Sequence, residues 1–254
     1  MTGEKPRERQ TVLILGAGSA IARAVARELA GRGYDLLLAG RDPEELEALC
    51  ADLRLRHAVR AQGQAFDALA FDTHGAFLEQ CRRAAQDTLF GTVLCFGYLG
   101  DQTLAQNDFR EARQILDTNL LAAVSILSLL ANHLESKREG FLCALASVAG
   151  DRGRQSNYVY GAAKAGLAVF LQGLRNRLFR SGVSVITIKP GFVDTQMTYG
   201  RPGLFLVASP EKAAKRIVTA ILQGKDESYV PGFWRPLLFL IRSIPEGIFK
   251  RMRL

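Results

Sequence analysis

Three residues near the middle of the chain have the types and spacing of an acid–base centre. Ser147 is followed by Tyr160 thirteen positions later, and Lys164 comes four positions after Tyr160. Side chains four positions apart share one helix face, so the Lys164 ammonium would lie beside the Tyr160 phenol. A free tyrosine titrates near about 10, and an adjacent cation favours the phenolate. We therefore expect a lowered pKa for Tyr160, with the Ser147 hydroxyl polarising a carbonyl oxygen.

The alternative interpretation of these residues is a surface pair, because Tyr and Lys at helical spacing are common on exposed helix faces. Tyr158 cannot take the place of Tyr160, since its i+4 partner is Ala162. The choice between chemistry and a solvated helix face depends on the elements around the three residues.

Short apolar runs alternate with helical patterns along the chain. The expected strands are 11–15, 34–39, one ending at 66–67, 92–96, 141–147, 183–189 and 228–230. The helices are expected from about 20 to 31, from 43 onward, and at 76–86, 105–138, 158–180 and 210–222. Strands alternating with helices indicate an α/β protein with a doubly wound, seven-stranded parallel sheet. The apolar stretch 120–134 should be buried, in the core or at a subunit interface.

The chain divides into a polar N-terminal extension (1–10), a single domain (11–230) and a basic, apolar C-terminal tail (231–254). Its 254 residues, 48% of them hydrophobic and 23% charged, are typical of a globular protein. No signal peptide is expected, and the apolar run 120–131 is too short to span a bilayer. These features predict a cytoplasmic protein, and the tail allows a position at the inner face of the membrane.

The remaining composition argues against several classes of site. Four widely spaced cysteines indicate reduced thiols (Cys50, Cys81, Cys95 and Cys143). Three scattered histidines predict no metal site. The net charge of +8 comes without a nucleic-acid-binding motif, so no nucleic-acid partner is expected.

A glycine turn after the first strand predicts a phosphate cradle. Gly16 and Gly18 lie between the strand 11–15 and a helix start, where backbone N–H groups and the helix dipole face an anion. The second strand ends at Gly40-Arg41. A site for NAD usually has an acid there, whereas a guanidinium would bind a 2′-phosphate. We therefore favour NADP(H) over NAD(H), the alternative being a solvated Arg41.

The order of these motifs resembles the short-chain dehydrogenase/reductase family from about 11 to 230, and so implies a Rossmann fold. The resemblance rests on the Gly16 turn, Asn119, Ser147, Tyr160 and Lys164. It continues with Pro190-Gly191 and Val193-Asp194-Thr195. It implies an NAD(P)(H)-dependent oxidoreductase that reduces a carbonyl group to an alcohol, and a homodimer or homotetramer formed through the long helices.

The resemblance also assigns a role to each matching residue. Tyr160 would be the proton donor or acceptor, Lys164 would hold the nicotinamide ribose, Ser147 would orient the carbonyl, and Asn119 would position a water that links Lys164 to solvent. The cofactor-binding positions would be Tyr160 and Lys164 together with Gly16, Gly18, Ser19, Ala20, Ile21, Arg41, Asp67, Gly97, Pro190, Gly191, Val193 and Thr195. Asp67 would contact the adenine ring, and Val193 and Thr195 would fix the carboxamide.

Two motifs depart from the family pattern. Leu15 stands where Thr is common in the glycine turn, and Ala20 and Ala22 replace the second and third glycines. The Asn-Asn-Ala-Gly element after the fourth strand is replaced by Leu-Cys-Phe-Gly, of which Gly97 alone matches. Each alanine adds one methyl group near the pyrophosphate, and we expect the turn to tolerate it because Gly16 keeps the sharp bend.

Two further features concern the substrate. Arg152 and Arg154 follow Ser147 closely and could attract an anionic group, or they could be solvated loop arginines. The segment 233–254 combines bulky apolar residues with five basic ones, which suits peripheral contact with anionic lipid, a cover over an apolar pocket, or packing on the domain or a partner subunit.

This version of the family is similar to decaprenylphosphoryl-2-keto-ribose reductases, which implies a lipid-linked keto-sugar substrate. A generic soluble carbonyl, acyl or quinone reductase is the alternative. A non-catalytic dinucleotide sensor is a second alternative, which the presence of both Tyr160 and Lys164 disfavours.

Overall fold

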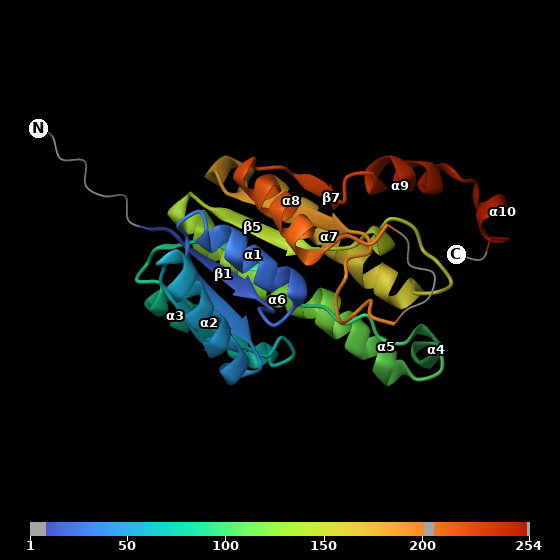
Figure 1. The fold of residues 1–254 in the computed structure, drawn as a ribbon. Coiled ribbons are helices and arrows are strands. Elements are labelled where there is room, and N and C mark those ends of the chain that lie inside the picture. Colours follow the sequence, from blue (N-terminus) through green and yellow to red (C-terminus); the bar gives the residue numbers. More distant parts are fainter. Residues whose placement is uncertain (1–8, 201–205, 253–254) are drawn as a thin grey trace, which may run out of the picture.

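The structure is a computed structural model that describes residues 9–200 and 206–252. Most of the predicted N-terminal extension (1–8), part of the loop before residue 208 (201–205) and the last two residues of the tail therefore lie outside the described residues. Within the described chain, seven parallel strands form one sheet in the order β3-β2-β1-β4-β5-β6-β7 (Figure 1). The predicted α/β class, doubly wound topology and strand count are confirmed.

The strands are short and are separated by helices along the chain. They are β1 (Thr11–Leu15), β2 (Asp35–Gly40), β3 (Ala61–Ala65), β4 (Leu89–Leu94), β5 (Phe141–Leu145), β6 (Ser184–Pro190) and β7 (Glu227–Val230). The helices are α1 (Ala20–Ala30), α2 (Pro43–His57), α3 (His74–Ala84), α4 (Gln102–Ala105), α5 (Phe109–Leu116), α6 (Ala122–Lys137), α7 (Tyr158–Leu178), α8 (Pro210–Leu222), α9 (Trp234–Ser243) and α10 (Glu246–Phe249).

Alternation along the strands builds two apolar layers, one on each face of the sheet. In β1, Val12 and Ile14 pack under α1, α2 and α8, whereas Leu13 and Leu15 pack against α3, α6 and α7. This period of two is what a strand buried on both faces requires. The helices of the two layers lie on opposite sides of the sheet in Figure 1.

Local capping explains where several helices begin. Ser19, Asp42 and Ser209 precede α1, α2 and α8, and each side chain accepts a hydrogen bond from a backbone N–H in the first turn. Proline is the first residue of both α2 and α8, where its fixed φ is compatible with the helix.

Some predicted boundaries differ from the structure. Strand β4 begins at Leu89 and ends at Leu94, so the prediction 92–96 was shifted toward the C-terminus. The predicted helix 105–138 is interrupted after α4, and α5 joins α6 through a π-helical turn, Asp117–Leu121. The stretch 120–134 is buried on its inner face only, because Leu121 is half exposed.

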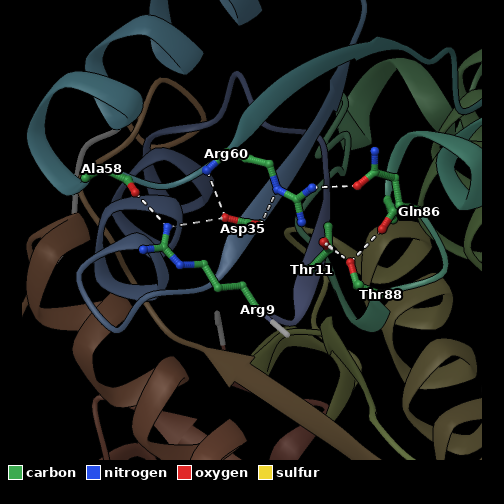
Figure 2. A network of polar contacts seen from close by, with 8 residues as sticks. Arg9, Thr11, Asp35, Ala58, Arg60, Gln86 and Thr88 are labelled. Carbon is green, nitrogen blue, oxygen red and sulfur yellow. Dashed lines mark hydrogen bonds and ion pairs between the residues drawn. The ribbon is translucent and has the colours of Figure 1, made fainter. Parts of the chain in front are cut away.

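A polar network closes the sheet at the amino ends of its strands. Figure 2 shows Asp35 between the guanidinium groups of Arg9 and Arg60. The Asp35 carboxylate is 2% exposed and accepts hydrogen bonds from the Arg60 backbone N–H (2.8 Å) and Nε (2.7 Å). Beside it, the hydroxyl groups of Thr11 and Thr88 form a hydrogen bond, with 2.7 Å between the two Oγ1 atoms. The carboxyl ends of the strands lie at the opposite edge of the sheet, which is where open α/β sheets bind their ligands.

Candidate active site

Three of the four predicted catalytic residues, Ser147, Tyr160 and Lys164, lie where β5 gives way to α7. Ser147 follows the end of β5 by two residues and caps a 3₁₀ turn, Val148–Gly150, by accepting a hydrogen bond from the Ala149 N–H (3.1 Å). Tyr160 and Lys164 lie in the first two turns of α7. The chain therefore brings all three to the carboxyl edge of the sheet.

Lys164 is buried and directed at the end of β5. Its side chain is held by a hydrogen bond of 2.9 Å from Nζ to the Leu145 carbonyl oxygen. The same Nζ lies 5.7 Å from the centroid of the Tyr160 ring. The i,i+4 spacing thus places the ammonium beside the tyrosine, as predicted.

The pKa of Tyr160 differs from the sequence expectation. Burial raises the pKa of Tyr160 to about 12, although a hydrogen bond with the Ser147 side chain opposes the rise. Burial also lowers the pKa of Lys164 to about 8. The sequence argument counted the neighbouring cation but not the removal of both groups from water, which disfavours their charged forms.

Asn119 lies in the π-helical turn and faces Lys164 across a glycine. Its Nδ2 donates to the Ile115 carbonyl (2.8 Å), and its Oδ1 accepts from the Tyr98 N–H (3.1 Å). A Cβ on Gly97 would lie 2.9 Å from Asn119 Oδ1 and 3.4 Å from Lys164 Nζ. Gly97 therefore allows the close approach of the two polar groups.

The glycine turn leads into α1 as predicted. Gly16 has φ of 81°, and a Cβ there would lie 2.7 Å from the backbone N of Phe96. Ser19 caps the helix by accepting from the Ala22 N–H (3.2 Å). Ala20 and Ile21 are the first residues of α1, where backbone N–H groups have no partner within the helix. The turn can therefore offer amides to an anion.

Two other predicted cofactor residues follow β2 and β3. Arg41 is exposed directly after Gly40, and the next residue, Asp42, uses Oδ1 to cap α2. Asp67 follows β3 and is exposed, and its Oδ1 accepts from the Leu69 N–H (3.0 Å). Both side chains are at the carboxyl edge of the sheet.

The segment after β6 packs under the C-terminal tail. Pro190 ends β6, and a Cβ on Gly191 would overlap the Trp234 indole at the start of α9. Val193 is buried and forms a bridge with Ala208. The Thr195 N–H donates to the Thr198 hydroxyl at 3.0 Å. The tail is thus a neighbour of the predicted cofactor segment.

The tail also packs on the residue after Ser147. Val148, Tyr229, Trp234 and Leu238 form an apolar cluster beside the site. Arg152 pairs with Glu246 (2.7 Å), donates to the Arg242 carbonyl (3.1 Å) and lies over the Phe249 ring.

The two loop arginines consequently differ. Arg152 is engaged with the tail, whereas in the described chain Arg154 makes only a long hydrogen bond (3.5 Å) to the Val148 carbonyl. Burial lowers the pKa of Arg154, and its Nε is buried without a partner among the described residues. Arg154 is thus the one of the pair that keeps donors for a ligand.

Sequence reasoning missed a buried carboxylate that organises the loop after β4. Glu111 Oε1 accepts from the Tyr98 hydroxyl (3.0 Å) and from the Asp101 N–H (2.9 Å). The available signal was its spacing, because Glu111 shares a face of α5 with Ala112 and Ile115, which are buried.

Two further properties concern metal ligands and apolar helices in the described ranges. Among residues 9–200 and 206–252, no group of His, Cys, Asp or Glu side chains could hold a metal. In those ranges one helical stretch, Phe109–Lys137, has the length and mean hydropathy (1.6) of a membrane span. Its α6 segment packs into the core through Ile126, Leu127 and Leu130, which is the behaviour of a core helix.

Comparisons with known proteins identify the family of the chain. Residues 10–202 match the short chain dehydrogenase family. An uncharacterised oxidoreductase of Mycobacterium tuberculosis is 37% identical over 242 residues, covering 95% of this chain and 96% of the relative.

Two solved structures have the same fold. A short-chain dehydrogenase from Sphingobium yanoikuyae in complex with NADPH superposes with a TM-score of 0.79 at 24% identity, covering 94% of this chain and 97% of that one. A single-residue variant of the actinorhodin polyketide ketoreductase with NADPH gives 0.80 at 20% identity, covering 91% and 99%. The family match covers residues 10–202, and the relative of 37% identity covers nearly the full length of both chains. This chain therefore belongs to the short-chain dehydrogenase/reductase family of oxidoreductases.

Proposed function

We propose that the protein reduces a carbonyl group to an alcohol, with Tyr160 as the general acid and NADPH as the preferred hydride source. The observation that carries this proposal is the hydrogen-bonded pair of Ser147 and Tyr160 with the Lys164 ammonium buried beside it. A hydroxyl, a phenol and a cation at one point can bind a carbonyl oxygen and deliver a proton to it.

The proton chemistry follows from the two pKa values. With a pKa raised to about 12, the Tyr160 phenol keeps its proton at neutral pH and can donate it as negative charge develops on the substrate oxygen. Ser147 donates a hydrogen bond to the same oxygen and holds it in place. With a pKa of about 8, Lys164 is an ammonium at neutral pH and stabilises the phenolate that forms. We assign Asn119 the water that links Lys164 to solvent.

The residues at the carboxyl edge fit a nicotinamide dinucleotide. When bound, this cofactor supplies the hydride. The open N–H groups at the start of α1 suit the pyrophosphate, and Gly97 gives the space beside Lys164. NADPH is favoured over NADH because Gly40 removes the usual acid and Arg41 offers a guanidinium to a 2′-phosphate. We assign Asp67 to the adenine ring, and Val193 and Thr195 to the nicotinamide carboxamide.

The substrate is a small molecule that carries a carbonyl, and our narrower hypothesis is a keto-sugar on a polyprenyl phosphate. Arg154 supports an anionic group near the chemistry, since it keeps unpartnered donors in the described chain. The outer side of the tail supports a lipid. Phe239 and Leu240 on α9 are 70% and 64% exposed, with Arg235 and Arg242 exposed on the same helix.

Assembly into a homodimer or homotetramer is part of the proposal. Large apolar side chains are exposed on the central helices, with Phe109 and Val169 more than half exposed and Leu121 half exposed. We assign these side chains to the contact with a second copy of the chain. Light scattering on the purified protein measures the assembly directly.

The test of the function is oxidation of NADPH and NADH by purified protein. The carbonyl substrates are a keto-sugar polyprenyl phosphate and, separately, soluble ketones. Turnover of the lipid-linked sugar alone, with NADPH preferred, supports the narrower hypothesis. Turnover of soluble ketones alone would support the reductase activity and rule out the lipid-linked substrate. A protein that binds the cofactor and reduces no carbonyl would overturn the proposal.

A further inference from the structure

A pocket beside the proposed active site contains none of the residues predicted from the sequence. It has a volume of about 200 Å³ and lies between the loop after β4 and the start of α7. Its lining residues are Leu99, Gly100, Asp101, Gln102, Thr103, Ser156 and Asn157.

Hydrogen bonds within the protein hold the wall formed by the loop after β4. The Glu111 carboxylate accepts hydrogen bonds from the Tyr98 hydroxyl and the Asp101 N–H of this loop. Gly100 has φ of 66°, and a Cβ there would lie 2.6 Å from Glu111 Oε1. Asp101 then caps α4 by accepting from the Leu104 N–H (2.9 Å). This wall of the pocket is therefore positioned by contacts within the protein.

The Gln102 side chain presents a donor with no partner. Its Oε1 accepts from the Val159 N–H at 3.0 Å, at the open start of α7. Because an amide has one oxygen and one NH₂ group, this bond fixes which end carries the donors. The Nε2 group is buried and unpartnered among the described residues.

Asn157 presents the complementary group. It precedes α7 without capping it through its side chain, and its Oδ1 is buried with no partner in the described chain. A buried donor and a buried acceptor without partners are costly, so they indicate a ligand or a water that completes them.

The pocket adjoins the proposed chemistry. Asn157 is the residue immediately before α7 and comes three positions before Tyr160. Leu99, which lines the pocket, packs in the same apolar cluster as Tyr160.

We infer that this pocket binds a hydroxyl group of the substrate, so that the enzyme prefers ketones that carry a hydroxyl near the carbonyl. A hydroxyl both donates and accepts, and it therefore satisfies Gln102 Nε2 and Asn157 Oδ1 together. A plain alkyl or acyl chain would leave both groups unpaired, and such sites reject the analogue that lacks the hydroxyl. This inference rests on the proposed function and names its substrate class.

The test compares two ketones with the same four-carbon skeleton, erythrulose and butan-2-one, with NADPH. Gln102→Glu keeps the oxygen that accepts from Val159 and replaces the free donor by an acceptor. We expect it to lower kcat/KM for erythrulose by about 10-fold or more, chiefly through KM, and to leave butan-2-one within about twofold. Asn157→Leu should act in the same direction. Gln106→Glu makes the same charge change at an exposed position just after α4 and should alter neither substrate.

The outcomes separate the two proposals. Equal losses for both ketones, or no loss for either, overturn the hydroxyl subsite while the reductase activity stands. In the second case the pocket holds water only. A wild-type protein that reduces no ketone of any kind overturns the proposed function, and the subsite with it.

Discussion

The Lys164 ammonium is bound by the Leu145 carbonyl, a neutral acceptor 2.9 Å away at the last residue of β5. The buried cation therefore has a dipole as its partner and not a carboxylate. Such a group loses its proton more easily than a paired one, because no counter-charge offsets its removal from water. The pH dependence of the enzyme follows from this relationship.

Reduction should fail as pH rises through about 8. Below this value Lys164 is an ammonium that stabilises the Tyr160 phenolate, and above it the amine is neutral. We expect kcat/KM for reduction to fall on the alkaline side with an apparent pKa near 8. A pH–rate profile from 6 to 10 measures it, and a flat profile would contradict the assignment.

Loss of the Lys164 proton should lower activity but raise the free energy of unfolding. Lys164 has a folded pKa of about 8 against 10.5 for the free group, so between these values the unfolded state binds more protons. Its contribution to folding therefore improves as pH rises through this window. Lys164→Met should be the more stable protein near pH 7.5, and its advantage should shrink by about 1–2 kcal/mol by pH 9.5. Urea unfolding at both pH values tests the sign.

Removing the phenolic hydroxyl should abolish turnover and spare cofactor binding. Tyr160→Phe keeps the ring in its apolar cluster and removes only the proton donor. We expect kcat to fall by about 10²–10⁴-fold, with the dissociation constant for NADPH within a few-fold of wild type. Single-turnover kinetics and fluorescence titration separate the two effects. Full activity in this variant would mean that another group supplies the proton.

Cofactor preference should follow the residues after β2. Gly40→Asp restores an acid at the end of the strand, and its Cβ meets Leu46 at an ordinary contact distance of 3.4 Å. Combined with Arg41→Ala, it should shift the ratio of kcat/KM from NADPH toward NADH by about 10–100-fold. Lys225→Ala, on the loop between α8 and β7, serves as the control for loss of an exposed cation. An unchanged ratio in the double variant would mean that Arg41 is only a solvated side chain.

The network at the amino ends of the strands should matter for stability alone. Asp35→Ala leaves the backbone N–H of Arg60 without its partner and should cost about 1–3 kcal/mol of unfolding free energy. The site lies on the opposite edge of the sheet, so kcat/KM should stay the same. Denaturant unfolding and steady-state kinetics on one preparation test both statements.

Membrane contact should depend on the exposed side of α9. Phe239→Ser with Leu240→Ser removes exposed apolar side chains and leaves the buried Trp234 and Leu238 in place. We expect weaker sedimentation with vesicles that contain anionic lipid, and weaker binding of wild type at high salt. Leu55→Ser is the control, since Leu55 is 88% exposed on α2. Equal vesicle binding by all three proteins would remove the membrane from the proposal.

Much of the fold could be predicted because local signals agreed with one another. The strand 11–15 was a short apolar run that ends at the Gly16 turn. Helices α2 and α8 each had a capping residue and a proline where the helix begins. The break between α4 and α5 was missed because Asp108, which caps α5, lies inside a region that is helical on average. Strand β4 was misplaced because Gly91, inside it, packs against Phe141 and was not counted as a strand residue.

Some features of the proposed site could also be predicted from the sequence, and others could not. Spacing was enough to bring Tyr160 beside Lys164, since helix geometry is local. The direction of the Tyr160 pKa was wrong because burial depends on residues distant in sequence. Arg152 was a candidate to face the substrate, yet its partners Glu246 and Phe249 lie more than ninety positions away. The pairing of Gln102 with the start of α7 had no local signal at all.

Trp234 covers Gly191 and packs with Val148, and it comes later in the chain than every strand of the sheet. The last strand, β7, ends only four residues before Trp234, so the sheet and the indole that covers the Ser147 loop become available almost together during synthesis. Because domains generally fold as units, β7 and α9 should form in one step. Closing the Ser147 loop would therefore coincide with completing the edge of the sheet.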